Sequence, residues 1–407
     1  MAKPHIITAL DIGSDTVKLL SACRKNDGEG FEVLAQYQEP SLGIRKGVVI
    51  NVSQVSKTIS SLIEKAEQDC GIKIDKVYAN IGGGHISSVP SRGLVSVSRA
   101  DRKISQEDVD RVINAARTLP LHSNKEIIQV FPKEFIVDGQ AGVREVVDME
   151  GVRLEAETLL LCGFAPYINN SSHTILDAGL QVNDLIPDPL ASAKSVLTPR
   201  EKELGVCVLD IGSGTTGMAV YEEGSLTHAA VFPVGSGHIT NDIAICLKTD
   251  IDTAEKIKLE YGRCKEVTKK QDKKSEKNIK LDGEDQLEFS TKLLTDIIDA
   301  RVSEIFNLAG KELKKISKQG MLPAGIVLTG GGAKLIGIRD LSKKELKLPC
   351  RVGKPKEFVG FDAETNLATL CGLVLEGFDI EGDIKHLSMK KGRLTSRLKN
   401  IFRTFVP

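Results

Sequence analysis

Two copies of one short motif bring together residue types that could bind a phosphate group. Residues 6–20 read IITALDIGSDTVKLL and residues 205–220 read GVCVLDIGSGTTGMAV, and aligning Asp11 with Asp210 gives LDIGS-x-T in both copies. Glycine lets the backbone bend so that consecutive N–H groups converge on an anion, and hydroxyl side chains add donors. The residues of these two types are Gly13 and Ser14 in the first copy, and Gly212, Ser213, Gly214, Thr215 and Thr216 in the second.

The aspartates of the two copies predict a metal ion beside the phosphate. Asp11 and Asp210 would repel a bare phosphate, so we expect both to hold Mg²⁺, through its waters, between carboxylate and phosphate oxygens. A single Asp-Ile-Gly could be only a tight turn capped by its aspartate. Two matched copies, each entered by an apolar run rich in β-branched residues, favour the phosphate site.

The elements around each motif indicate a hairpin and a duplicated architecture. An apolar run leads into each aspartate, and a second one leaves the glycine-containing turn before a further turn signal at 26–30 or 222–225. Each copy is therefore predicted to be a β-hairpin with the Asp-x-Gly-Ser turn at its tip. Two such hairpins predict related halves with a cleft between them.

The glycines at 212–217 also satisfy the GxGxxG pattern of dinucleotide-binding folds. That pattern requires the glycine turn to open a helix, whereas MAVYEEGSLTHAAVF follows here, with strand-like residues broken by a turn. The sequence also contains no GxxxxGK[ST]. We therefore expect neither a dinucleotide fold nor a P-loop.

A third glycine cluster, GIVLTGGGAKLIGI at 325–338, predicts a strand over 326–329 and a helix beginning near Ala333. Gly330, Gly331 and Gly332 could let the backbone approach a flat ligand, although a glycine-rich turn without a ligand would read the same way. In DTAEKIKLEYG, Glu255 and Lys258 share one helical face and could bond a ribose and an adenine edge. Most such pairs are solvated surface pairs.

Composition is that of an ordinary globular protein, with 407 residues, 41% hydrophobic and 27% charged. The eight cysteines are scattered without a CxxC spacing, which predicts reduced thiols and excludes a disulfide framework. The N-terminus lacks a signal-peptide pattern and no apolar run approaches about 18 residues, so we expect a chain that is neither exported by an ordinary signal nor membrane-spanning.

The net charge of zero conceals a basic C-terminus. Six basic residues and no acidic one stand between Lys390 and Pro407, so residues 1–389 carry a net charge of −6. Within GRLTSRLKNIFRTFVP, large apolar residues fall on one helical arc, flanked or opposed by basic ones. The apolar residues are Leu394, Leu398, Ile401, Phe402 and Phe405, and the basic ones are Arg393, Arg397, Lys399 and Arg403.

This pattern favours an amphipathic helix at 393–407 that lies on an anionic membrane surface, after a polar linker at 379–392. A helix docked on its own body would more often carry mixed charge on its solvent face. The exposed apolar face is poorly suited to nucleic acid, so we expect no nucleic-acid partner.

The order DIGSDT, DIGSGTT, ExxK, LTGGGA resembles the superfamily of actin, heat-shock chaperone ATPases and sugar kinases. Within it, the sequence resembles the FtsA family of bacterial cell-division proteins over nearly the whole chain. The segments that carry this resemblance are RKGVVINVSQVSKTI (45–59), GGGHISSVPSRGLV (82–95), PLASAKSVL (189–197), FPVGSGHITNDIA (232–244) and LPAGIVLTGGGAKLIGI (322–338).

The resemblance implies an α/β, actin-like fold of two lobes with duplicated halves, a small subdomain inserted in the first half and a C-terminal amphipathic helix. It implies these parts: subdomain IA (1–83, 163–202 and 359–378), inserted subdomain IC (84–162), subdomain IIA (203–237 and 322–358), subdomain IIB (238–321), the linker (379–392) and the membrane-targeting helix (393–407).

The same resemblance implies that ATP and Mg²⁺ bind between the lobes. It places Asp11 and Asp210 at the phosphates, Glu255 and Lys258 at the base and ribose, and Gly330, Gly331, Gly332, Ala333 and Lys334 beside the adenosine. The first loop adds Asp15, Thr16 and Lys18. Three residues depart from the family pattern, namely Gly217, Asp15 and Asp188, so we expect weak or absent hydrolysis and assign no catalytic residue.

By resemblance, the chain would polymerise on the inner face of the cytoplasmic membrane at the division septum. There it would anchor the tubulin-like FtsZ ring and help recruit later division proteins. Subdomain IIB, with a predicted helix at about 289–315, would grip the FtsZ C-terminal peptide, and Arg301 could pair with it or be an ordinary surface arginine. The alternatives are an actin-like ATPase of type IV pilus assembly and a phosphotransferase of the same superfamily.

Overall fold

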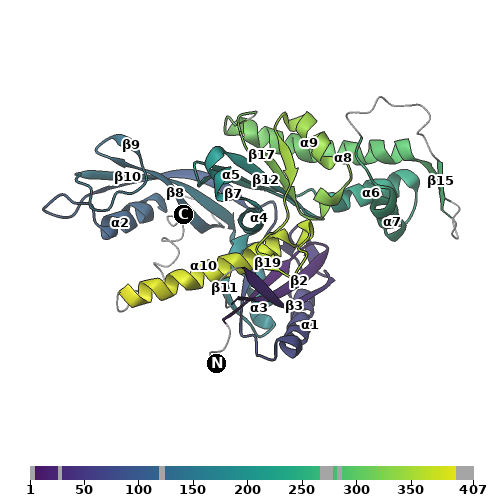
Figure 1. The fold of residues 1–407 in the computed structure, drawn as a ribbon, viewed down its shortest axis with the longest axis horizontal. Helices are drawn as coiled ribbons and strands as arrows, with labels where there is room; N and C mark the ends of the chain where they lie inside the picture. Colours follow the sequence, from purple (N-terminus) through teal and green to yellow (C-terminus); the bar gives the residue numbers. More distant parts are fainter. Residues whose placement is uncertain are drawn as a thin grey trace.

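The computed structural model describes residues 5–25, 30–118, 124–265, 278–281, 287–318 and 320–390. Two lobes, each built on a β-sheet with helices packed against it, make up the body, and a third group of elements projects from one side (Figure 1). The related halves predicted from the motif repeat and the α/β, two-lobed architecture implied by the family resemblance are confirmed.

The first lobe holds a six-stranded sheet in the order β11-β6-β1-β2-β3-β19. β1 (Ile6–Ile12), β2 (Thr16–Arg24) and β3 (Phe31–Pro40) form an antiparallel meander, and β6 (Lys76–Ile81) and β11 (Gln181–Pro187) continue parallel to β1. β19 (Phe358–Val359) pairs with β3, and the short hairpin β4 (Ile44–Arg45) and β5 (Val48–Val49) stands apart.

The second lobe repeats this pattern. β12 (Val206–Ile211), β13 (Thr216–Glu222) and β14 (Ser225–Phe232) form the antiparallel meander, and β17 (Gly325–Thr329) and β18 (Cys350–Val352) run parallel to β12. The two five-stranded cores therefore share strand order and strand direction. Because β1 and β12 carry the two Asp-Ile-Gly motifs, the duplication read from the sequence is a duplication of the fold.

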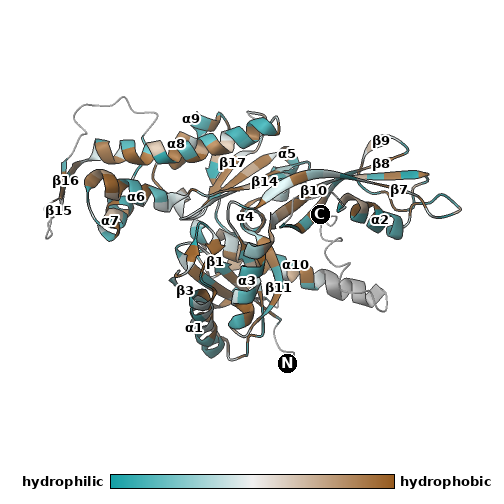
Figure 2. Cartoon of the chain, turned by 180° about the vertical axis from the view of Figure 1, so that it is seen from behind, coloured by the Kyte–Doolittle hydropathy of each residue, from teal (hydrophilic) through white to brown (hydrophobic). Residues whose placement is uncertain are grey.

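Helices cover the sheets because their apolar residues recur at helical spacing. In α1 (Val52–Cys70), Val55, Ile59, Leu62 and Ala66 face the core of the first lobe, and the helix begins at Asn51, whose side chain accepts from the Gln54 N–H. Figure 2 shows hydrophobic residues gathered along the central strands and in stripes on the helices. The other helices of the first lobe are α3 (Ala165–Asp177) and α4 (Asp188–Val196).

The helices of the second lobe are α5 (Pro199–Leu204), α6 (Ser236–Leu247), α7 (Ile251–Tyr261), α8 (Thr291–Lys315) and α9 (Ile338–Leu346). α8 confirms the helix predicted at about 289–315. The hairpin of β15 (Asn278–Leu281) and β16 (Leu287–Ser290) precedes it. Most of the lysine-rich stretch between α7 and this hairpin lies outside the described residues.

The projecting part comprises β7 (Ser87–Ser96), α2 (Gln106–Ala116), β8 (Lys125–Val137), β9 (Gln140–Val143) and β10 (Arg153–Phe164). It has its own hydrophobic core, in which α2 packs on β10 and β7. A single pairing of Ala230 in β14 with Ser87 in β7 joins it to the sheet of the second lobe. The inserted part therefore extends that sheet while folding around a separate core.

α10 (Ala368–Lys390) crosses α4 at the centre of the molecule and continues outward (Figure 1). A Cβ at Gly372 would lie 1.7 Å from the Ala191 carbonyl oxygen, so only glycine permits this crossing. The helix does not end at Phe378, and the predicted linker is wrong for residues 379–390, which continue it. Ile380 is buried and Glu381 contacts His5, which anchors this stretch to the body.

The membrane-related predictions have different outcomes. Among the helices of the described residues, none is long and apolar enough to span a membrane. The predicted membrane-binding helix at 393–407 lies outside those residues, so it stays a prediction.

Candidate functional site

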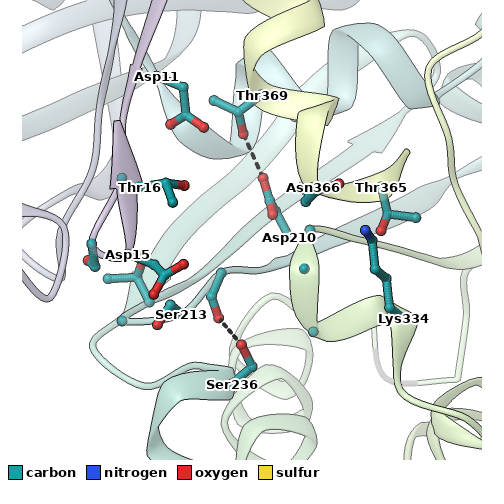
Figure 3. Close-up of a pocket in the computed structure, with 18 of the residues that line it drawn as sticks. Asp11, Asp15, Thr16, Asp210, Ser213, Ser236, Lys334, Thr365, Asn366 and Thr369 are labelled. Atoms are coloured by element: carbon teal, nitrogen blue, oxygen red, sulfur yellow. Dashed lines mark hydrogen bonds between the residues drawn. The ribbon is translucent and has the colours of Figure 1, made fainter. Parts of the chain in front are cut away.

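A cleft of about 600 Å³ lies where the two lobes meet. The turns of both Asp-Ile-Gly hairpins, the glycine turn after β17, helix α7 and the first residues of α10 all line it. Figure 3 shows Asp11, Asp15 and Thr16 on one side and Asp210 and Ser213 on the other. This volume falls in the range of about 300–1,000 Å³ common to small-molecule sites.

The predicted nucleotide-site residues line this cleft with two exceptions. Thr216 is fully buried, and its hydroxyl donates to the Val234 carbonyl at 2.8 Å, because it begins β13 facing the lobe interior. Ala333 packs into the core of the second lobe. Neither residue lines the cleft, so contact of these two with a nucleotide stays a prediction, while the remaining residues, from three distant parts of the chain, lie together in the cleft.

The two hairpin turns have the same hydrogen bond. The Gly13 N–H donates to the Thr16 carbonyl at 3.2 Å, and the Gly212 N–H donates to the Thr215 carbonyl at 2.9 Å. The turns also approach one another closely, because a Cβ on Gly214 would lie 2.5 Å from Ser14 Oγ. Two matching turns thus line a common space.

Three carboxylates line the base of the cleft, and two of them, Asp11 and Asp188, share one amide. Asn80 Nδ2 donates to Asp11 Oδ1 at 3.2 Å and to Asp188 Oδ1 at 2.8 Å, while its Oδ1 accepts from the Ile12 N–H at 2.6 Å. Lys18 Nζ lies 2.8 Å from Asp11 Oδ2. The third carboxylate, Asp210, accepts from the Thr369 hydroxyl at 2.8 Å (Figure 3).

Burial shapes the electrostatics of this group. Burial, reinforced by the charge of Asp11, raises the pKa of Asp188 to about 7 despite its bond from Asn80. Burial also raises the pKa of Asp210 to about 6, against the bond from Thr369. Burial opposes the charged form of Lys18, but Asp11, with smaller contributions from Asp210 and Asp15, outweighs burial and raises the pKa of Lys18. The carboxylates are thus short of positive charge, which suits a cation.

The donor set fits a hydrated metal ion better than a directly chelated one. Among the residues that the structure describes, no group of three or more Asp, Glu, His or Cys side chains is close enough to chelate a metal. Asp11 and Asp210 face the cleft from opposite lobes. Mg²⁺ held there through its waters, as the sequence suggests, therefore stays a prediction.

On the other side of the cleft, α7 presents a polar pair between apolar side chains. Lys258 Nζ lies 2.7 Å from Glu255 Oε2 and donates to Thr240 Oγ1 at 2.8 Å. Leu259 and Ile336, 75% and 61% exposed, also line the cleft. Apolar walls with a few fixed polar groups suit a flat, partly polar ring.

The glycine turn after β17 differs from its predicted form. Gly331–Lys334 form a 3₁₀ turn, η2, and the helix α9 begins only at Ile338. Gly337, with φ at 84°, separates the two because this left-handed conformation interrupts a helix. A Cβ on Gly330 would lie 2.4 Å from Asp210 Oδ1, so this position requires glycine.

Sequence reasoning missed several residues of the cleft. Asn80 lies near the end of an apolar run, one residue before three glycines, a signal that could have found it, and Asp188 was noted only as a departure from a family pattern. Thr365, Asn366 and Thr369 stand in no motif. Thr365 Oγ1 and Asn366 Oδ1 are buried in the cleft without a hydrogen-bond partner.

Arg301 is not a free cation. Its guanidinium binds Asp242 through Nε at 2.7 Å and Nη2 at 2.8 Å, and it also contacts Glu304. α6 and α8 therefore already supply two carboxylates to Arg301, and its pairing with an acidic peptide stays a prediction.

Comparisons with known proteins show the family to which this chain belongs. The family model described as the SHS2 domain inserted in FTSA matches residues 83–162, and the model described as cell division protein FtsA matches residues 207–372. The cell division protein FtsA of Pseudomonas aeruginosa is 34% identical over 394 residues, which cover 96% of this chain and 94% of that protein. The chain belongs to the FtsA family of cell division proteins. The predicted family and the insertion in its first half are confirmed.

Solved structures agree on the actin-like fold of this FtsA-family chain. A PilM–PilN type IV pilus biogenesis complex aligns with a TM-score of 0.66 and 18% identity, covering 91% of this chain and 98% of that one. MreB5 of Spiroplasma citri bound to ADP aligns with a TM-score of 0.57 and 13% identity, covering 94% and 98%. At these identities the likeness extends to the fold alone, so the pilus alternative gains nothing beyond it.

Proposed function

We propose that this actin-like cell-division protein binds Mg-ATP in the cleft and assembles into filaments on the inner face of the cytoplasmic membrane. There it ties the tubulin-like FtsZ ring to the membrane at the septum and helps recruit later division proteins. The observation that carries the nucleotide part is the pair of matching glycine turns that face one cleft from two duplicated lobes.

Different residues of the cleft would contact different parts of the nucleotide. The turns at 13–16 and 212–215 would hold the phosphates through N–H groups and hydroxyls. Asp11 and Asp210 would hold Mg²⁺ through its waters, and the bound metal would neutralise phosphate charge. Glu255 and Lys258 would contact the ribose and base, with Leu259 and Ile336 beside the ring.

Phosphates held by both lobes would draw the lobes together, because each turn gains contacts only in the closed arrangement. ATP therefore acts as a conformational ligand that favours the assembly-competent state. Asn80 holds Asp11 and Asp188 together by hydrogen bonds. An Asp at position 188 reaches less far than the Glu common in the family, which supports slow or absent hydrolysis.

Membrane attachment would depend on the C-terminal residues. Basic residues near an anionic leaflet contribute about 1 kcal/mol each, and the chain end carries six without an acidic neighbour. Single copies would bind reversibly, and a filament would multiply the attachment. The FtsZ peptide would bind the subdomain of α6 and α8, where its carboxylates reach Arg301 only by replacing Asp242 or Glu304.

Co-sedimentation with vesicles containing anionic lipid tests the whole proposal. The full chain should pellet with the vesicles, more so with Mg-ATP, and should carry FtsZ with it. Deleting residues 393–407 should abolish pelleting while leaving the unfolding transition of the body unchanged. Asp210→Ala should greatly weaken Mg-ATP binding in solution without affecting vesicle binding in the absence of nucleotide. Vesicle binding by the truncated chain would refute the anchor, and unchanged Mg-ATP affinity of Asp210→Ala would refute the site.

A further inference from the structure

The first residues of α10 form an unassigned part of the cleft. The 3₁₀ turn η3 (Thr365–Leu367) leads directly into α10, so a continuous helical run begins inside the cleft. Figure 3 shows Thr365 beside Lys334, and Asn366 between Thr365 and Asp210. None of the sequence motifs includes this segment.

Two polar atoms here are buried without a protein partner. Thr365 is only 2% exposed, and its Oγ1 makes no hydrogen bond, although the residue lines the cleft. Asn366 also lines the cleft, and its buried Oδ1 makes none either. Buried polar groups in folded proteins are almost always paired, so two neighbouring orphans that face a cavity point to a missing ligand.

The surroundings hold Thr365 in place for such a ligand. Its carbonyl accepts from the Gly330 N–H at 3.1 Å and from Thr329 Oγ1 at 3.2 Å, which fixes this residue to the glycine turn. Thr369, one turn further along, is committed to Asp210. The Thr365 hydroxyl therefore keeps a defined position while its own hydrogen-bonding capacity remains unused.

The start of this helical run also has no side-chain cap. Glu364, the residue at the N-cap position, makes no side-chain bond to the helix and instead pairs with Lys334. The first N–H groups of a helix carry partial positive charge and attract anions. Asn366 can present its amide nitrogen instead of its oxygen after a half-turn of the carboxamide, because the two atoms have nearly the same shape.

We propose that the N-terminal end of this run is a third phosphate-binding element, in which the Thr365 hydroxyl and the Asn366 amide donate to phosphate oxygens of a nucleoside di- or triphosphate. This inference rests on the proposed nucleotide site and adds a contact that neither hairpin turn supplies. It places the start of the helical run that leads into α10 in direct contact with the phosphates.

Calorimetric titration of the full chain tests this element with three probes: Mg-ADP, adenosine and pyrophosphate with Mg²⁺. Asn366→Asp keeps the shape of the side chain but places a negative charge against the phosphates, so Mg-ADP and pyrophosphate should bind at least about tenfold more weakly. Thr365→Val should weaken both by about three- to tenfold, and Thr365→Ser should restore them. Adenosine affinity should stay unchanged in all three variants.

Asn114→Asp, on the exposed side of α2, and Thr58→Val, on α1, are matched controls and should bind as the wild type does. Unfolding midpoints separate loss of binding from loss of fold, and the Ser variant keeps the hydroxyl test informative if the Val variant unfolds. Equal Mg-ADP affinity in Asn366→Asp and wild type would overturn the inference.

A wild type that binds neither Mg-ATP nor Mg-ADP would contradict the proposed function instead. The pyrophosphate titration would then decide the inference separately. Weaker pyrophosphate binding by Asn366→Asp would support it, and unchanged or absent pyrophosphate binding would overturn it.

Discussion

Gly214→Ala tests whether the turns of both lobes bind one ligand together. Position 214 has no left-handed φ, so alanine adds no backbone strain there, and its effect must come from contact alone. The new Cβ would lie 2.5 Å from Ser14 Oγ and 2.8 Å from Ser14 Cβ. Ordinary carbon contacts are about 3.5–4.0 Å, so the facing turns must move apart by about 1 Å.

The size of the effect follows from the cost of overpacking. An extra methyl group in a tight contact costs about 1–3 kcal/mol. If this cost falls on the closed arrangement, the affinity for Mg-ATP drops by about 5- to 150-fold. At a ligand concentration about 100 times the wild-type Kd, ligand stabilisation would fall from about 2.7 to about 0.9 kcal/mol for an affinity about thirtyfold weaker.

Thermal unfolding with and without Mg-ATP measures this difference directly, and calorimetry gives the Kd. Gly310→Ala in α8 is the matched control, since its Cβ would meet only Leu346 at an ordinary 3.6 Å. Adding Ser14→Gly to Gly214→Ala removes the clashing side chain and should recover part of the affinity. A Gly214→Ala protein that binds Mg-ATP within twofold of wild type would show that the turns do not close on a common ligand.

Two further predictions concern stability. Asp108 is fully buried, and hydrogen bonds from Ser105, Arg111 and Ser98 outweigh burial and hold its pKa well below the ordinary value. Asp108→Asn should therefore cost about 2–3 kcal/mol in urea unfolding at neutral pH. Because the folded-state pKa is lowered, the wild-type advantage should be complete above the unfolded pKa of about 4 and shrink as the pH falls below it, and a constant difference down to pH 2 would contradict this account. Gly372→Ala should destabilise by more than about 3 kcal/mol through its overlap with Ala191, while Gly382→Ala in the same helix, with open space, should not destabilise; equal unfolding midpoints for the two variants would refute the crossing geometry.

Local motifs predicted much of the fold and the phosphate side of the cleft. The two Asp-Ile-Gly hairpins could be read from sequence because turn glycines and flanking strands are adjacent in the chain. The duplication was enough to infer that the two hairpins meet at one cleft. The direction of Thr216 could not, because a shift of one residue along a strand exchanges the cleft for the interior, and only the pairing of β13 fixes that choice.

The rest of the cleft depends on contacts between residues far apart in sequence. Asn80 reaches Asp11 through the parallel pairing of β1 with β6, and Thr369 reaches Asp210 from the far end of the chain. Neither an asparagine nor a threonine indicates such a partner by its residue type. The predicted linker failed for a related reason, since polar residues such as Asp379 and Glu381 suggested a tether although Lys194 and His5 bind them to the body.

α10 extends by unequal lengths on the two sides of its crossing with α4. Gly372 is the fulcrum, about 10 Å from the cleft end at Thr365 and about 27 Å from Lys390 at a rise of about 1.5 Å per residue. A tilt about this fulcrum moves the distal end more than twice as far as the cleft end. If a ligand in the cleft tilts α10, then a load applied at the distal end alters the affinity for that ligand, because coupling between two sites is reciprocal. In that case, force on the distal end of α10 and binding in the cleft would both act on the tilt of this helix.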